Sequence, residues 1–177
     1  GTNPPIDALR EGTSFSLQCP IGPEGNLLKM MCADSCKRIM LDEPVLDTGR
    51  FLAVTQLHNF PCATLDMTCS LDDTNKRQTR HALGNMKGQF VIEERIDQIC
   101  IEAESAINDG AAIIVLSHRR AGPGRAPIDS ALACGALHHH LVKLQLRTSA
   151  AIIVESMDTI EVHHHAVLLG FGCDAIY

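Results

Sequence analysis

The chain has 177 residues, of which 45% are hydrophobic and 20% charged, and this composition is typical of one globular domain. It carries 21 acidic side chains against 15 Lys and Arg, a formal net charge of −6, and only 3% of its residues are aromatic. Disorder is therefore excluded, and nucleic acid is not an expected partner, because a basic field and stacking side chains are both missing. The longest apolar runs fall far short of the ~20 residues of a bilayer span, so we expect no membrane partner either.

Turn signals are frequent in the first third of the chain, residues 1–61. We predict an irregular segment there with at most short helices, one of them over residues 7–17. Weak alternation over residues 63–68 predicts a strand. The stretch 70–88 is polar and without periodicity, so we predict a long loop that is either mobile or a docking surface.

Helical and strand patterns alternate from residue 90 onwards. Apolar side chains at three-and-four spacing predict a helix over residues 90–108, and continuous apolar runs over 111–117 and 149–155 predict strands buried on both faces. Further helices are expected over residues 128–146 and 160–169, and a last strand over 173–176. This alternation predicts an α/β fold in which parallel βαβ units over residues 62–177 form a three-layer sandwich or a partial (β/α) barrel. We expect residues 1–177 to form a single domain.

The loop over residues 117–127 follows a predicted parallel strand, at the edge of the sheet where α/β proteins bind their ligands. It contains Arg119, Arg120 and Arg125, and guanidinium groups can bind a carboxylate through paired hydrogen bonds. These three residues are a candidate anion-binding loop. The alternative is ordinary solvated loop charge.

Histidine and cysteine are the other candidate ligands. The triplets His138-His139-His140 and His163-His164-His165 cannot converge on one ion, because consecutive helical side chains point about 100° apart. The eight cysteines lack the paired short spacings of zinc sites, and none lies in a nucleophile motif. We therefore predict no metal site and no catalytic residue. We expect the cysteines to be reduced, as in an intracellular protein. In each His triplet we expect one ring to be buried and hydrogen-bonded.

Several blocks of sequence resemble one family in the same order. The first are Thr2-Asn3-Pro4-Pro5-Ile6-Asp7-Ala8-Leu9-Arg10-Glu11 and Ile21-Gly22-Pro23-Glu24-Gly25-Asn26; later blocks are Ile113-Ile114-Val115-Leu116-Ser117, Gly135-Ala136-Leu137-His138-His139-His140-Leu141 and Leu168-Leu169-Gly170-Phe171-Gly172. Together they resemble the central domain of glutamate synthase. His118 departs from the family, which usually has Asp there, and His165 stands where the family commonly has a hydrophobic residue.

The resemblance implies a connecting domain that is a partial, cofactor-free relative of the family's FMN barrel. Its partners would be the amidotransferase and FMN-binding synthase domains of the same polypeptide. That enzyme makes L-glutamate from glutamine and 2-oxoglutarate, uses FMN and an iron–sulfur cluster, and receives electrons from NAD(P)H or ferredoxin. The segment would help to form the internal ammonia tunnel, with Thr2 and Asn3 near its wall, and would be inactive alone. The expected location is the cytoplasm, or a plastid in a plant or alga.

Two alternatives stay open at this point. One is a free-standing small (β/α) protein that binds an anionic metabolite through its arginine loop. The other is a metal-binding module built on the histidines and cysteines.

Overall fold

A computed structural model describes residues 11, 15–24, 37–71 and 87–177 of the chain. Thr2 and Asn3, most of the helix predicted over residues 7–17, and residues 72–86 of the predicted loop lie outside this part. No described helix has both the length and the apolar character needed to span a membrane.

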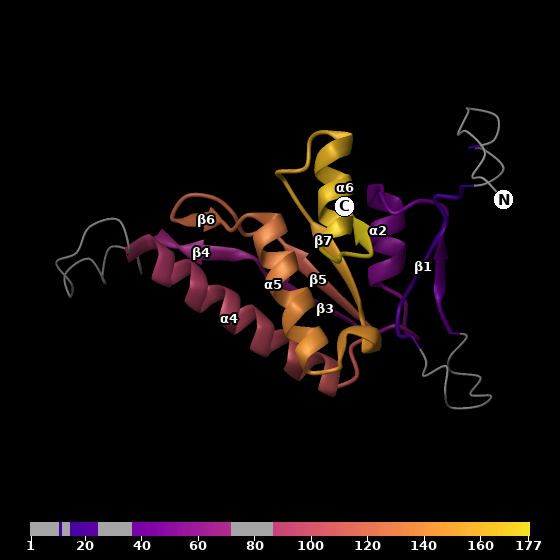
Figure 1. The fold of residues 1–177 in the computed structure, drawn as a ribbon, viewed down its shortest axis with the longest axis horizontal. Helices are drawn as coiled ribbons and strands as arrows, with labels where there is room; N and C mark the ends of the chain where they lie inside the picture. Colours follow the sequence, from indigo (N-terminus) through magenta and orange to yellow (C-terminus); the bar gives the residue numbers. More distant parts are fainter. Residues whose placement is uncertain (1–10, 12–14, 25–36, 72–86) are drawn as a thin grey trace, which may run out of the picture.

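A parallel four-stranded sheet forms the centre of the fold (Figure 1). Its strands are β3 (Cys62–Asp66), β5 (Ile113–Ser117), β7 (Ala151–Glu155) and β8 (Ala175–Ile176), and they lie side by side in chain order. Strands β5 and β7 are buried along their whole length. Apart from their last residues, both are runs of aliphatic, mostly β-branched residues, which suit a strand covered on both faces.

The strands are joined by helices on one face of the sheet. These are α4 (Lys87–Asn108), α5 (Ser130–Lys143), which is followed by the short 3₁₀ helix η2 (Arg147–Ser149), and α6 (Val162–Gly170). Leu116 and Val154 of the sheet pack in one core with Ala103 of α4, Leu137 of α5 and Leu168 of α6. The predicted α/β fold with parallel βαβ units is therefore confirmed.

The first third of the chain covers the opposite face of the sheet (Figure 1). Its antiparallel strands β1 (Cys19–Ile21) and β2 (Ile39–Leu41) and its helix α2 (Thr48–Thr55) form a second core with the other face of β5, β7 and β8. The described part of this segment is thus more regular than its turn signals predict. As a result the sheet is the middle of three layers. In a closed barrel this same face would line the interior.

A small antiparallel pair projects beyond the end of β3. It consists of β4 (Thr68–Ser70) and β6 (Arg125–Pro127), in which Ser70 lies opposite Arg125. Strand β6 occupies the end of the predicted loop 117–127, so that loop is partly regular. The pairing brings Arg125 back over the last residues of β3.

Candidate functional site

The carboxyl ends of the strands carry polar side chains that face one another. Asp66, Ser117 and Glu155 are the last residues of β3, β5 and β7, and the strand register places Ser117 opposite both of the others. Because the strands are parallel, all three residues lie at the same edge of the sheet, the usual position of ligand sites in α/β proteins. We call these three residues, together with Arg119, Arg120 and Arg125, the carboxyl-end cluster.

Glu155 is the buried centre of one half of this cluster, with 8% of its surface exposed. The Ser117 hydroxyl donates a short hydrogen bond to its Oε2, and Arg119 donates to its Oε1 through Nε at 2.8 Å and through Nη2. The Ser117 hydroxyl in turn accepts a hydrogen bond from the Arg119 amide at 3.0 Å. Hydrogen bonding to Glu155 raises the pKa of Arg119 above its ordinary value. The buried carboxylate is therefore satisfied within the chain.

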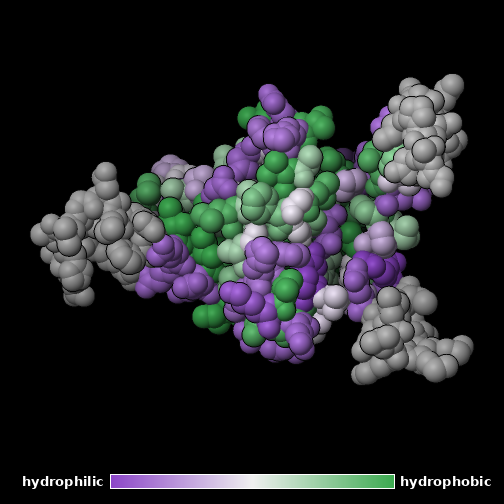
Figure 2. All heavy atoms as spheres, viewed as in Figure 1, coloured by the Kyte–Doolittle hydropathy of each residue, from purple (hydrophilic) through white to green (hydrophobic). Residues whose placement is uncertain are grey.

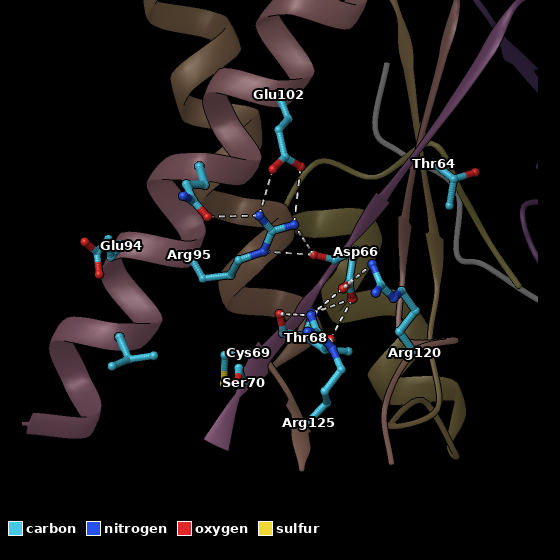
Figure 3. Close-up of a pocket in the computed structure, with 12 residues that line it drawn as sticks. Thr64, Asp66, Thr68, Cys69, Ser70, Glu94, Arg95, Glu102, Arg120 and Arg125 are labelled. Carbon is cyan, nitrogen blue, oxygen red and sulfur yellow. Dashed lines mark hydrogen bonds and ion pairs between the residues drawn. The ribbon is translucent and has the colours of Figure 1, made fainter. Parts of the chain in front are cut away.

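Asp66 is the centre of the other half (Figure 3). Its Oδ2 accepts from Arg125 Nη2 at 2.5 Å and lies 3.4 Å from Arg120 Nη1, while its Oδ1 accepts from the Thr68 hydroxyl at 2.6 Å. Arg125 Nε also donates to the Thr68 hydroxyl at 2.8 Å. Arg125 is held on several sides, whereas the Arg120 side chain is 69% exposed and makes only the looser contact.

Two hollows border the cluster and share Thr64, Asp66 and Arg120 in their walls. One, of about 520 Å³, lies between α4 and strands β3 and β4; the other, of about 420 Å³, lies beside α2. Three acidic and three arginine side chains line the larger one, so it carries no net attraction for an anion. Arg95 spans this hollow, donating to the Asp66 carbonyl at 2.7 Å and to Glu102 at 2.8 Å (Figure 3).

The three arginines of the predicted anion loop therefore lie close to two carboxylates of the chain itself. Arg119 pairs with Glu155 and Arg125 with Asp66, whereas Arg120 makes the longest ion pair of the three, at 3.4 Å from Asp66. The binding of an external anion by this loop stays a prediction.

The backbone amides of the same loop are also used internally. The His118 amide donates to the Glu155 carbonyl, and the Arg119 amide donates to the Ser117 hydroxyl. The Ala121 amide donates to the His118 carbonyl, and the Gly122 amide donates to the Arg125 carbonyl. A phosphate group is normally bound by free amides at the start of a helix or in a nest of successive N–H groups. These four amides are therefore not free to bind a phosphate group.

His118 is a buried polar residue, only 4% exposed. Its Nε2 lies 2.7 Å from the Ile128 carbonyl and its Nδ1 accepts from the Met157 amide at 3.4 Å. This pattern matches the tautomer that carries a proton on Nε2. The nearby hydroxyls of Ser130 and Ser156 bond to Asp158 instead of to the ring. A serine, an aspartate and a histidine thus lie close together without the hydrogen bond that activates a nucleophile.

Both histidine triplets are dispersed. His138 is half-buried; its Nδ1 accepts from Arg147 Nε at 3.1 Å, and burial, followed by the charge of Arg147, lowers its pKa. In the second triplet His163 and His164 are exposed and His165 is half-buried. The prediction of one buried, hydrogen-bonded ring in each triplet is wrong for α6, where the buried side chain is Leu168. In the first triplet it holds only in part, because His138 is hydrogen-bonded but half-buried. Within the described ranges, no three His, Cys, Asp or Glu side chains could hold a metal ion together.

The described cysteines are free thiols. Burial raises the pKa of Cys100 to about 11, and contact with Cys134 together with burial raises the pKa of Cys173. Both thiols are therefore protonated and poor ligands or nucleophiles at neutral pH. Cys32 and Cys36 lie outside the described residues.

Sequence reasoning named the three arginines but missed their partners Asp66 and Glu155. The signal that could have found them is the position of each acidic residue at the end of a predicted strand. Such a residue ends a strand of the central sheet at the edge where ligands bind, as Ser117 does.

Comparisons with known proteins find relatives over almost the whole chain. The family model described as the glutamate synthase central domain matches residues 1–177. Glutamate synthase [NADH] of Schizosaccharomyces pombe is 38% identical over 99% of this chain, and the NADPH large chain of Bacillus subtilis is 36% identical over 99%. The ferredoxin-dependent, chloroplastic enzyme of Spinacia oleracea is 33% identical over 99%. The chain spans 8% of the first of these relatives and 10% of the other two. Sequence, fold and relatives together show that this chain belongs to the glutamate synthase central domain family.

Proposed function

We propose that this domain is a non-catalytic connector in a longer glutamate synthase, and that it helps to form the passage through which ammonia moves between two catalytic domains. The chain corresponds to about a tenth of the relatives' length, as expected for one domain among several. Its partners in this proposal are an amidotransferase domain that hydrolyses glutamine and an FMN-binding domain that makes glutamate from ammonia and 2-oxoglutarate.

The observation that carries the proposal is the internal pairing of the carboxyl-end cluster. In a catalytic α/β domain this edge offers free acids, bases or phosphate-binding amides to a substrate. Here Glu155 and Asp66 are bound by Arg119 and Arg125. The face of the sheet that would line a barrel is packed against Phe51 and Val54 of α2. These groups support a structural role better than a catalytic one.

The same reasoning supports a location for the cofactors outside this segment. Four amides after β5 are occupied, and buried thiols such as Cys100 and Cys173 hold their protons. We infer that FMN and the iron–sulfur cluster are bound by other parts of the longer protein. The hydride or electrons of NAD(P)H or ferredoxin would reach the flavin there.

Ammonia transfer is assigned to Thr2 and Asn3, which the family resemblance places near the tunnel wall. A hydroxyl and a side-chain amide can both donate and accept hydrogen bonds, so they can pass an ammonia molecule along without charging it. Both residues lie outside the described part of the chain, and their role is a proposal from sequence.

Bulky substitutions test this role in the full-length protein. Thr2→Phe and Asn3→Phe should leave glutamine hydrolysis intact but reduce the glutamate formed per glutamine hydrolysed, because ammonia escapes before it meets 2-oxoglutarate. Glutamate formation from added ammonium should be unchanged. Asn108→Phe, at the exposed end of α4, is the matched control and should keep the two reactions coupled. Unchanged coupling in both test variants would contradict the proposed passage.

A further inference from the structure

The smaller hollow, beside α2, has one apolar wall and one polar wall. Phe51 and Leu52 of α2 form the apolar side, and the ends of β3, β5 and β7 form the polar side. Its volume of about 420 Å³ lies within the range of small-molecule sites in proteins. Figure 2 shows apolar and hydrophilic atoms mixed across the visible face, including the region where Figure 1 places α2. The apolar wall is thus a small element of the surface, and it suits a small molecule better than a protein partner.

The carboxyl-end cluster, which borders this hollow, contains one guanidinium group more than it has carboxylates. Glu155 is paired with Arg119, and Asp66 accepts from Arg125 at 2.5 Å. Arg120 lies farther from Asp66, with Nη1 3.4 Å from Oδ2, which is longer than an ordinary N–H···O hydrogen bond. Figure 3 shows Arg120 and Arg125 on different sides of this carboxylate. Arg120 is therefore the surplus cation of the cluster.

Arg120 can turn to an outside acceptor without leaving the Asp66 carboxylate unpaired. Asp66 would keep Arg125 and the hydrogen bonds from the Thr68 hydroxyl at 2.6 Å and the Thr68 amide at 3.1 Å. The Arg120 side chain is already 69% exposed, and the contact with Asp66 is its only ion pair to a described residue. A guanidinium group has several N–H donors, so most of those of Arg120 remain for a ligand.

The rest of the polar wall is held in place before any ligand binds. Arg119 donates to Glu155 through Nε at 2.8 Å and through Nη2, and the Ser117 hydroxyl donates to the same carboxylate. The side chains of Thr64 and Thr55 also line the hollow, and the Thr55 hydroxyl is fixed by its hydrogen bond to a carbonyl of α2 at 2.9 Å. A site that is ordered beforehand loses little conformational entropy when it binds, which favours affinity.

We propose that this hollow binds a small monocarboxylate with a short aliphatic body. Arg120 holds the carboxylate, because a guanidinium group binds a carboxylate through paired, charge-assisted hydrogen bonds. One surplus positive charge matches one negative charge, whereas a phosphate dianion needs more positive charge or free amides. The aliphatic body lies against Phe51 and Leu52, and it covers a leucine that is 46% exposed in the free protein. The site does not depend on the proposed connector role.

Titration calorimetry of the full-length protein tests the site with isocaproate as the probe. We expect saturable binding of isocaproate. Binding should be at least about tenfold weaker for acetate, which lacks the aliphatic body, and for isocaproamide, which lacks the charge. An absence of saturable isocaproate binding would overturn the proposal, and so would an equal affinity for either of the other compounds.

Substitutions assign the binding to this hollow. Arg120→Gln removes the surplus charge but keeps Asp66 paired, and it should weaken isocaproate binding at least about tenfold. Thr64→Phe, at an exposed position of β3, should fill the hollow and abolish binding while the charge stays. Lys143→Gln, at the exposed end of α5, is the matched control and should leave the dissociation constant unchanged.

Two results would contradict the assignment. An unchanged dissociation constant in Arg120→Gln or in Thr64→Phe would place the binding elsewhere in the longer protein and overturn the proposal. An equal loss in Lys143→Gln would show a general effect of charge and would overturn it as well. The readout does not involve glutamine hydrolysis or ammonia transfer, so its failure is distinguishable from failure of the proposed function.

Discussion

Two glycines with nearly the same backbone φ should respond very differently to substitution by alanine. Gly172 and Gly110 have φ values of +104° and +99°, in a region that residues other than glycine rarely adopt. At Gly110 an added Cβ would meet no atom within 4 Å. At Gly172 it would collide with the ring of His138, 2.9 Å from Cε1 and closer still to Nδ1 and Cγ. The pair therefore separates backbone strain from steric overlap.

The expected magnitudes follow from these surroundings. A left-handed backbone conformation destabilises the folded state of an alanine variant by about 1–2 kcal/mol. The variant's unfolded chain is less flexible, which offsets about 0.4–1 kcal/mol of this loss, so Gly110→Ala should lower the free energy of unfolding by about 1 kcal/mol. Gly172→Ala must also displace a ring that is held by Arg147, and overpacking of this kind adds about 1–3 kcal/mol. We expect a total of about 3 kcal/mol. At about 2–4 °C per kcal/mol for a domain of this size, Tm should fall by roughly 10 °C.

Urea unfolding followed by circular dichroism measures both variants. The double variant Gly172→Ala/His138→Ala should lose less stability than the sum of its two single changes, because removal of the ring makes room for the added Cβ. Equal destabilisation by Gly172→Ala and Gly110→Ala would refute the steric reasoning, and so would strict additivity in the double variant.

Two further predictions concern the polar groups. Ser117→Ala should lower the free energy of unfolding by about 1–2 kcal/mol, because it removes one hydrogen bond to buried Glu155 and another from the Arg119 amide. As the control, Ser105→Ala at an exposed position should change the free energy of unfolding by no more than a few tenths of a kcal/mol. Burial and then Arg147 lower the pKa of His138, so the unfolded chain binds the proton more readily and stability should fall as the pH drops below about 6.5. His138→Gln should weaken the pH dependence of the free energy of unfolding, measured by urea unfolding between about pH 7.5 and about pH 5.5. An unchanged pH dependence would contradict the assignment to this ring.

The elements with a long periodic pattern could be predicted from sequence. The apolar runs over residues 111–117 and 149–155 became β5 and β7, and the amphipathic pattern over 90–108 became α4. Their ends moved by a few residues for local reasons. Helix α5 begins only after Asp129, whose carboxylate accepts from the Leu132 amide, and it ends before Gln145, which has a φ of 60°.

The short elements and the site partners could not be predicted in the same way. Strands β4 and β6 have three residues each, too few for a period, and they exist because they pair with each other. Helix α2 has an N-cap at Asp47, but the following Thr48-Gly49 weakens its helical signal. The pairing of Arg119 with Glu155 spans 36 positions and depends on β5 and β7 being neighbours. Such a contact follows from topology and has no local pattern.

The early residues of the chain are joined to its last strand, and this matters for how the domain is made. The Leu46 amide donates to the Ile176 carbonyl at 2.7 Å, the Ile176 amide donates to the Pro44 carbonyl at 2.8 Å, and the Phe51 ring stacks on Tyr177 with centroids 4.2 Å apart. During translation the segment around Leu46 must wait for about 130 further residues, roughly 6–26 s at 5–20 residues per second, before its binding site exists. Until β5, β7 and β8 have all been made, the core that covers Phe51 and Val54 is incomplete. We therefore expect this segment to be the part of the domain that chaperones bind and proteases cut first.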